Sequence, residues 1–198
     1  MTSSNPIAGA ACVGAGVGPK AIDEVWGVAK AYSTRVGEGP FPTELHDEIG
    51  RHMLERGHEY GTTTGRERRC GWIDLVALRY AARINGLTGL VITKLDVLAG
   101  IDPLRVCTSY TNDEGAVFEE FPYHQSILHS AKAVTEDRPG FEEDIGGCRS
   151  LDELPVEAQR YLEFIADFVG VPVKLVGVGP GREQVIWADG VRPLRAVA

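Results

Sequence analysis

Residues 90–96 have the sequence Leu-Val-Ile-Thr-Lys-Leu-Asp. Their short apolar run is rich in β-branched side chains, which favours a buried β-strand over 90–95. Asp96 then lies at the carboxyl end of that strand, where open α/β sheets bind ligands. A carboxylate there can accept hydrogen bonds from the ring N–H and the exocyclic amine of guanine, while the stem of Lys94 lies along the purine. A salt bridge at the strand end is the alternative, because a four-residue pattern is weak by itself.

Helices are expected on both sides of this strand along the chain. Apolar residues at helical spacing predict amphipathic helices over 21–32, 72–85 and 156–169, and the charged segment 44–56 is also expected to be helical. Glycine directly follows the expected helices 44–56, 72–85 and 156–169, as is typical of helix C-termini. The segments expected to be irregular are 1–20, 35–42, 61–71 and 123–154.

Further strands complete the expected fold. Residues 171–176 and 184–188 are predicted strands, and 104–110 and 116–121 are predicted to form a hairpin. Pro122 ends the second hairpin strand, because proline cannot donate to a ladder. Strands that alternate with helices indicate an α/β fold with a parallel-rich sheet, covering helices and a hairpin excursion.

Composition excludes several classes of function. The 198 residues carry a net charge of −8, which argues against general binding to nucleic acid. No apolar run is long enough to cross a membrane, and the N-terminus does not resemble a secretory signal. The four cysteines form no C-x-x-C pair, so we expect no zinc site and a reduced, cytoplasmic chain.

The segment Gly61-Thr-Thr-Thr-Gly-Arg-Glu-Arg-Arg-Cys-Gly71 is basic within an otherwise acidic chain. Guanidinium groups bind carboxylate or phosphate bidentately, and threonine hydroxyls and loop N–H groups add neutral donors. The helix expected from Trp72 would direct its positive end toward a bound anion. These features favour an anion site. The alternative is a solvated loop whose arginines pair with nearby acids.

Two further glycine-rich segments differ in what they indicate. Gly177-Val-Gly-Pro-Gly181 follows a predicted strand and either contacts a ligand through its backbone or merely turns the chain. Gly14-Ala-Gly-Val-Gly18 matches neither the dinucleotide motif nor the phosphate loop, since Pro19 precedes Lys20.

Together these segments resemble the adenylosuccinate synthetase family. The likeness includes Thr2-Ser-Ser-Asn5, the segments 30–37 and 39–45, Gly61 to Trp72, residues 93–97 and Gly179-Pro180, all in the order and at the spacing of that family. It covers nearly the whole chain and corresponds to the C-terminal half of the family only. The resemblance implies that residues 1–198 form a single C-terminal portion of a P-loop-related α/β fold.

The resemblance also implies an activity and its ligands. Members of the family are GTP-dependent carbon–nitrogen ligases of AMP biosynthesis, which join IMP and L-aspartate into adenylosuccinate with Mg²⁺ as cofactor. The implied partners are IMP, L-aspartate, GTP and either a second copy, as in the full-length homodimer, or a separate N-terminal chain. Neither nucleic acid nor a membrane is an expected partner.

Site residues follow from the resemblance position by position. The implied aspartate loop consists of Thr62, Thr63, Thr64, Gly65, Arg66, Glu67 and Arg68. The implied IMP site consists of Thr2, Val36, Gly37 and Arg66. The implied GTP site consists of Arg68, Lys94, Leu95, Asp96, Gly177, Val178 and Gly179.

Departures from the family pattern limit the expected activity. The family's phosphate loop, Gly-Asp-Glu-Gly-Lys-Gly-Lys, does not occur in this sequence, and Gly177 stands where the family commonly has serine. We therefore assign no catalytic residue and no metal ligand to this chain, and expect no turnover from it alone. The alternative functions are an inactive fragment or a module that binds a guanine nucleotide or a partner. Unpaired sheet edges and exposed apolar faces are also expected.

Overall fold

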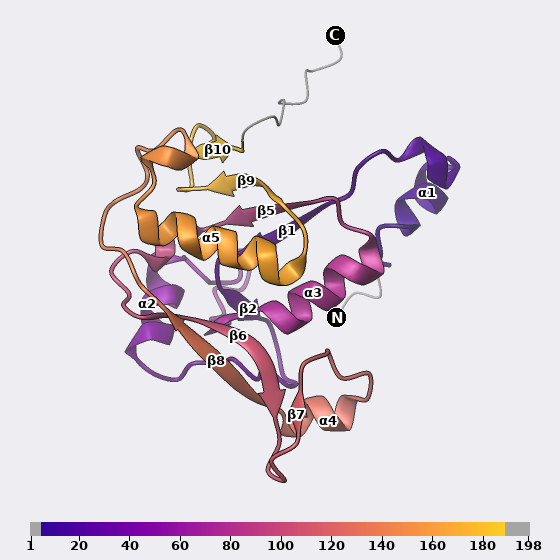
Figure 1. Ribbon diagram of the computed structural model, residues 1–198, viewed down its shortest axis with the longest axis horizontal. Coiled ribbons are helices and arrows are strands. Elements are labelled where there is room, and N and C mark those ends of the chain that lie inside the picture. Colours follow the sequence, from indigo (N-terminus) through magenta and orange to yellow (C-terminus); the bar gives the residue numbers. More distant parts are fainter. Residues whose placement is uncertain (1–4, 189–198) are drawn as a thin grey trace.

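A four-stranded sheet forms the centre of the computed structural model, which describes residues 5–188 (Figure 1). Its strand order is β1-β5-β9-β10, with bounds Trp26–Lys30, Gly89–Thr93, Val173–Gly177 and Val185–Trp187. Strands β1, β5 and β9 are parallel, and β10 is antiparallel to β9. The parallel carboxyl ends therefore meet at one edge of the sheet, and the predicted parallel-rich α/β fold is confirmed.

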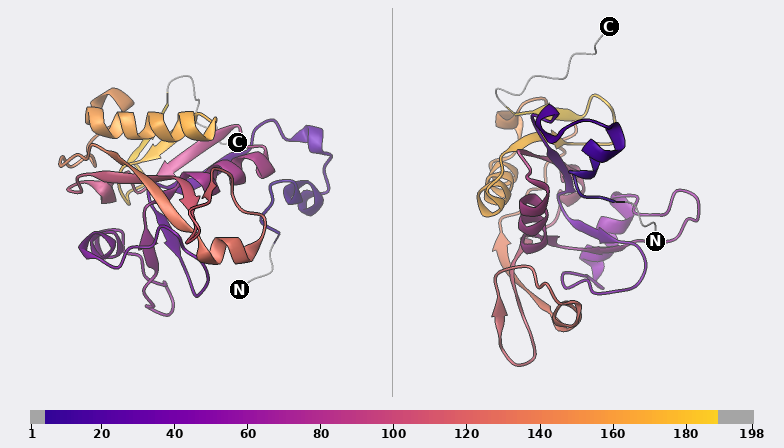
Figure 2. Two further views of the ribbon diagram at one scale, coloured as in Figure 1. Left: turned by 60° about the horizontal axis from the view of Figure 1, so that its bottom comes forward. Right: turned by 90° about the vertical axis from the view of Figure 1, so that its right-hand side faces the viewer.

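Two helices cover one face of this sheet. They are α3 (Leu75–Asn85) and α5 (Val156–Val169), which lie on the same side of the sheet in the right-hand view of Figure 2. Leu90 and Ile92 of β5 point into the core between sheet and helices and are fully buried. On the opposite face Val28 of β1 is 74% exposed, and β1 is the end strand of the sheet. The described part of the sheet therefore ends on a strand with one exposed apolar side chain.

A second sheet is built around the long strand β6 (Leu104–Thr111). β6 pairs with β4 (Ile73–Asp74) in parallel, and with β7 (Val117–Phe118) and β8 (Lys132–Arg138) in antiparallel orientation. The predicted β6–β7 hairpin is confirmed. The Asn112 side chain closes its turn by accepting hydrogen bonds from the backbone N–H groups of Glu114 and Ala116, at 3.1 and 2.9 Å.

The remaining elements are short and surround the carboxyl end of the central sheet or project from it. Strand β2 (Ser33–Arg35) pairs with β3 (Arg69–Gly71), beside helix α2 (Glu48–Arg56). The other short elements are α1 (Ala10–Ala15), α4 (Gln125–Ser130) and the 3-10 turns η1 (Pro19–Ala21), η2 (Leu95–Leu98) and η3 (Leu151–Glu153). Figure 1 shows α4 and β7 at the far end of the β6–β8 pair, away from the central sheet.

Four of the predicted segments are wrong. The segment 61–71, expected to be irregular, ends in strand β3. Residues 21–32 contain strand β1 instead of a helix, because parallel pairing with β5 overrides the helical spacing of the apolar residues. The segment 123–154 contains α4 and strand β8, whose side chains are mostly exposed and therefore lack an apolar pattern. Residues 1–20 contain the short helix α1.

Asp74 connects the second sheet to helix α3. Its Oδ1 accepts a hydrogen bond from the backbone N–H of Ala77 at 2.9 Å, which caps α3, and its Oδ2 accepts one from the Tyr110 hydroxyl of β6 at 2.6 Å. Asp47 caps α2 in the same way, accepting from Gly50 N–H at 3.0 Å, but it is exposed. The two caps therefore differ in burial and in the tyrosine contact.

We expect Asp74→Ala to lower the free energy of unfolding by about 2–4 kcal/mol, because the cap is lost and the buried Tyr110 hydroxyl loses its acceptor. Asp47→Ala should lower it by only about 1 kcal/mol. Urea unfolding followed by circular dichroism measures both values. Equal losses in the two variants would show that the Tyr110 contact contributes nothing.

Candidate functional site

The two segments predicted to bind guanine lie side by side at the carboxyl end of the central sheet. Lys94 follows β5 in the left-handed region, with φ +60°, and Asp96 lies in η2 directly after it. Gly177 ends β9, and a β-carbon built there would lie 3.4 Å from the Cα of Thr93. This is an ordinary van der Waals distance, so the position also has room for the serine common in the family.

Not every residue of these segments can present a side chain to a ligand. Leu95 and Val178 are fully buried in the core, so only their backbone groups are available. A β-carbon at Gly179 would overlap the Gln184 side chain, which covers it. Gln184 accepts a hydrogen bond from Gly181 N–H at 2.8 Å and donates one to the Gly146 carbonyl at 3.2 Å. The turn after β9 is thus held against the segment around Gly146.

Asp96 is half-buried and lies just beyond the carboxyl end of β5, where its carboxylate can face a base. Burial raises its pKa, an effect opposed by a hydrogen bond from its own backbone N–H and by the nearby charges of Arg56 and Lys94. Asp144 is close enough to raise the pKa further. A partly desolvated acceptor of this kind makes stronger hydrogen bonds than one in water.

A buried glutamate, Glu59, lies between this edge and the basic loop. Helix α2 ends at Arg56, and Gly57 and His58, the latter with φ +47°, turn the chain so that Glu59 points inward. The Glu59 side chain is fully buried. It accepts hydrogen bonds from the Tyr32 hydroxyl at 2.7 Å, from Lys30 Nζ and Lys94 Nζ at 2.8 Å, and from Arg68 Nη1 at 2.9 Å.

These donors decide the charge of Glu59. Burial alone raises its pKa, but the hydrogen bonds from Lys30, Lys94 and Tyr32 outweigh burial and lower the pKa to about 2. Burial likewise lowers the pKa of Lys30. The Glu59 cluster, defined as Glu59 with Lys30, Tyr32, Arg68 and Lys94, therefore holds three cations around one carboxylate and keeps an excess of positive charge.

The loop predicted to bind aspartate is a short hairpin. Tyr60 and Glu67 form its closing bridge, Gly61 N–H donates to the Arg66 carbonyl at 2.8 Å, and Gly65 adopts φ +64°. Residues 62–67 are exposed at its tip. The hydroxyls of Thr62, Thr63 and Thr64 thus stand at the surface.

The three arginines of this segment have different surroundings. Arg68 binds Glu59, and Arg69 forms a bidentate pair with Glu44, with Nε 2.7 Å from Oε1, and donates to the carbonyls of Gly37 and Gly39. Within residues 5–188 the Arg66 guanidinium makes no ion pair or hydrogen bond. Pairing with nearby acids, the alternative stated for this loop, is therefore correct for Arg68 and Arg69, and Arg66 alone keeps a free guanidinium.

The predicted contribution of a helix N-terminus is wrong. Helix α3 begins at Leu75 instead of Trp72, and the carboxylate of Asp74 already accepts from its first turn. A bound anion beside the 61–68 loop would therefore meet no free helix end there. Its stabilisation has to come from the arginine and threonine side chains and from loop N–H groups.

Two hollows flank the basic segment. One of about 290 Å³ is lined by Gly37, Glu38, Gly39, Arg66, Glu67 and Arg69, so it brings two residues of the predicted IMP site, Gly37 and Arg66, together. Val36 beside it is 65% exposed. Thr2, the fourth predicted IMP residue, lies outside the described residues.

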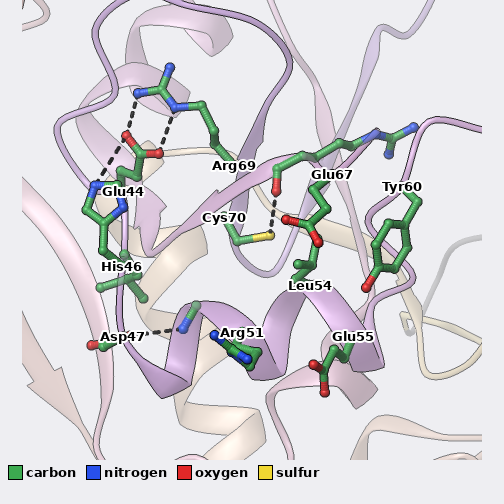
Figure 3. Close-up of a pocket in the computed structure, with 13 residues that line it drawn as sticks. Glu44, His46, Asp47, Arg51, Leu54, Glu55, Tyr60, Glu67, Arg69 and Cys70 are labelled. Carbon is green, nitrogen blue, oxygen red and sulfur yellow. Dashed lines mark hydrogen bonds and ion pairs between the residues drawn. The ribbon is translucent and has the colours of Figure 1, made fainter. Parts of the chain in front are cut away.

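The other hollow has a volume of about 460 Å³ and lies between α2 and the loop (Figure 3). Asp47, Arg51 and Glu55 line it from α2, and Glu67 to Cys70 from the loop. Figure 3 shows Glu44 joined to Arg69 at its upper rim. Lys94 and Asp96 do not belong to its lining, so the guanine segments do not share this hollow with the loop.

Sequence reasoning missed the Glu59 cluster. Lys30 and Tyr32 belong to a segment that carries the family resemblance, but nothing in the sequence around Glu59 distinguishes it from other glutamates. In the described part of the chain no three His, Cys, Asp or Glu residues gather as a metal site would require. No helix among residues 5–188 is long and apolar enough to cross a membrane.

The depressed pKa of Glu59 predicts a dependence of stability on pH. Because the folded value of about 2 lies below the unfolded value of ~4.3, the stabilisation is complete above ~4.3 and is lost as the pH falls toward 2. Glu59→Gln should therefore flatten the acid limb of the unfolding free energy by up to about 1.4 kcal/mol per pH unit. Urea titrations from pH 5 to 2 measure the slope. Glu55→Gln, an exposed neighbour, is the control and should keep the wild-type slope.

Comparisons with known proteins identify the family to which the sequence is similar. The sequence model of the adenylosuccinate synthetase family matches residues 1–186. The chain is 56% identical over 186 residues to the adenylosuccinate synthetase of Moorella thermoacetica, covering 94% of this chain and 43% of that protein. It is 59% identical over 189 residues to the enzyme of Gloeobacter violaceus, covering 96% and 43%.

A solved structure gives the same result in three dimensions. Fully ligated adenylosuccinate synthetase from Plasmodium falciparum superposes with a TM-score of 0.90 at 40% sequence identity, covering 94% of this chain and 45% of that one. The chain spans less than half the length of these relatives. Sequence and structure together show that the chain belongs to the adenylosuccinate synthetase family.

Proposed function

We propose that this chain supplies the guanine-binding and aspartate-binding elements of an adenylosuccinate synthetase, a ligase that joins IMP and L-aspartate with hydrolysis of GTP. The observation that carries the proposal is the placement of Lys94 and Asp96 beside Gly177 at the carboxyl end of the central sheet. Family membership supports it, since the relatives named above are adenylosuccinate synthetases.

Guanine recognition follows from the chemistry of this edge. The half-buried Asp96 carboxylate offers two acceptor oxygens, which match the N1–H and 2-amino donors of guanine and no such pair on adenine. The Lys94 stem and the backbone of residues 177–179 border the same place. Because Leu95 and Val178 are buried, their part is limited to backbone contacts and to support of the neighbouring residues.

Aspartate and IMP binding are assigned to the other side of the Glu59 cluster. Arg66 has a free guanidinium beside Gly37 and Val36, and the three threonine hydroxyls stand exposed at the hairpin tip. A dicarboxylate amino acid suits a site with one free guanidinium, a second arginine at the hairpin base and neutral donors between them. We assign Arg68 to both the aspartate and the GTP site, and Thr2 to the IMP phosphate.

The remaining chemistry is not assigned to this chain. The described residues do not fit the Mg²⁺ of the family, because they contain no cluster of ligating side chains, and no general acid or base is proposed among them. We propose that these groups come from a polypeptide equivalent to the rest of the relatives' length, either within a homodimer of longer chains or as a separate chain. The free edge of β1 and the exposed Val28 offer that polypeptide a place to pair.

A second candidate function is a non-catalytic module that binds a guanine nucleotide or a partner chain. The observation that favours it is the placement of Lys94 and Asp96 beside Gly177, which suits a guanine base whether or not phosphoryl transfer follows. Turnover measurements and binding measurements distinguish the two functions, because the module needs only the Lys94 and Asp96 contacts.

We expect Asp96→Ala to weaken GDP binding at least ~10-fold, because two hydrogen bonds to a charged acceptor are lost. Asp96→Asn should reverse the preference from guanine toward xanthine nucleotides, since xanthine presents a carbonyl where guanine carries its amino group. Fluorescence anisotropy with labelled GDP and XDP measures both. Asp113→Ala, an exposed aspartate in the distant β6–β7 turn, is the control. Unchanged GDP affinity in Asp96→Ala would refute the guanine assignment.

We expect no adenylosuccinate formation by the isolated chain at saturating IMP, GTP and aspartate, because phosphoryl transfer depends on phosphate and metal contacts that it is not assigned. Addition of a polypeptide carrying the phosphate-loop half of a relative should restore turnover, and Arg66→Ala should then abolish it. The absorbance change on formation of the product reports the rate. Turnover by the isolated chain would contradict the proposal.

A further inference from the structure

One buried carboxylate is shared by cations from three separate segments. Lys30 ends β1, Lys94 follows β5, and Arg68 stands at the base of the 61–67 hairpin, and all three donate to Glu59. We propose that Glu59 is a positioning residue that couples the Lys94 end of β5 to the hairpin, so that a ligand at one place changes the other. The ligands in this proposal rest on the proposed function, whereas the coupling itself rests on the contacts described here.

Close packing and a backbone hydrogen bond restrain the position of Glu59. It follows a turn in which Gly57 faces the Tyr32 hydroxyl so closely that a β-carbon would overlap it. Its own carbonyl accepts a hydrogen bond from Arg68 N–H at 2.8 Å, so the backbone of Glu59 also closes the base of the hairpin. A displacement of its side chain is therefore transmitted to the hairpin through both the Arg68 guanidinium and the Arg68 backbone.

The three cationic side chains of the Glu59 cluster are more exposed to solvent than the carboxylate. The side chains of Lys30, Arg68 and Lys94 are 24%, 31% and 34% exposed, whereas Glu59 is fully buried. Each cation can therefore turn toward a ligand, but Glu59 cannot follow. Lys94 Nζ also donates to the Gly57 carbonyl, which keeps the lysine stem beside Asp96 as long as Glu59 holds the ammonium.

The excess of positive charge in the Glu59 cluster predicts whether the two ligands favour or oppose each other's binding. Three positive groups around one carboxylate repel one another, and an anion that engages Arg68 neutralises part of this excess. Glu59 then interacts more strongly with Lys94 and Lys30, which fixes the Lys94 stem more firmly. Conversely, a purine that orders Lys94 steadies Glu59 and thereby the hairpin base. The two ligands are expected to favour each other's binding, and the reciprocity is required by linkage.

A substitution cycle in the 198-residue chain tests the coupling without any ligand. Lys94→Met removes the ammonium on β5, and the measured quantities are the NMR signal of Arg68 Nε–H and the hydrogen exchange of the Gly61, Gly65 and Arg68 amides. We expect exchange to accelerate about threefold, the effect of losing a partly exposed ion pair, and the Arg68 signal to shift. Lys132→Met, which removes a surface ion pair on β8, should change neither.

Lys94→Met in a Glu59→Gln background tests whether Glu59 transmits the effect to the hairpin. There Lys94→Met should add nothing to exchange in the hairpin, and Glu59→Asp should retain part of the effect if Glu59→Gln does not fold. An unchanged hairpin in Lys94→Met, or an equal effect with and without the Glu59 carboxylate, would overturn the proposal.

A ligand measurement separates this proposal from the proposed function. GDP added to the chain should slow hairpin exchange, and guanosine, which has no phosphate that Arg68 could contact, should slow it too and shift Arg68 Nε–H. Binding of GDP without any change in the hairpin would refute coupling and leave guanine recognition intact. Failure of GDP to bind would count against the proposed function, while the substitution cycle would still decide whether Glu59 couples the two segments.

Discussion

A carboxylate that is removed from water must be surrounded by donors, and Glu59 meets that requirement with groups from distant parts of the chain. Tyr32, Lys30 and Lys94 come from the ends of two parallel strands, and Arg68 from the far side of a hairpin. Removal of any one donor leaves the buried charge less compensated, so its effect extends to the donors that remain. The relative placement of the two proposed binding regions therefore depends on this one side chain.

The sequence predicted the elements whose local pattern and tertiary surroundings agree. The strand before Lys94 is apolar on both faces and is buried as expected, and α5 has the predicted bounds of 156–169 because its apolar stripe faces the core. β1 was mispredicted because its apolar residues satisfy helical spacing while its partner, β5, lies about 60 residues further along the chain. β8 was missed because its exposed charged side chains conceal a strand that only its pairing with β6 defines.

The candidate site was likewise predicted only in part from the sequence. The Thr-Lys-Leu-Asp segment and the glycines after β9 were found from their place after strands, and the structure brings them together. The separate surroundings of the three arginines could not be predicted, because Glu44 and Glu59 become their neighbours only through the folding of α2 against the hairpin. Sequence spacing thus located the ligand-facing segments, whereas the internal ion pairs that hold them required three-dimensional contacts.

Lys94 has a further consequence through its backbone. A residue with a β-carbon in the left-handed region is conformationally costly, by roughly 1–2 kcal/mol, and glycine would avoid that cost. The chain keeps a lysine there, whose ammonium reaches Glu59 and whose stem borders Asp96. A glycine would relax the backbone but remove both contacts, so attempts to make the protein hardier at this turn would gain durability at the expense of the Glu59 and Asp96 surroundings.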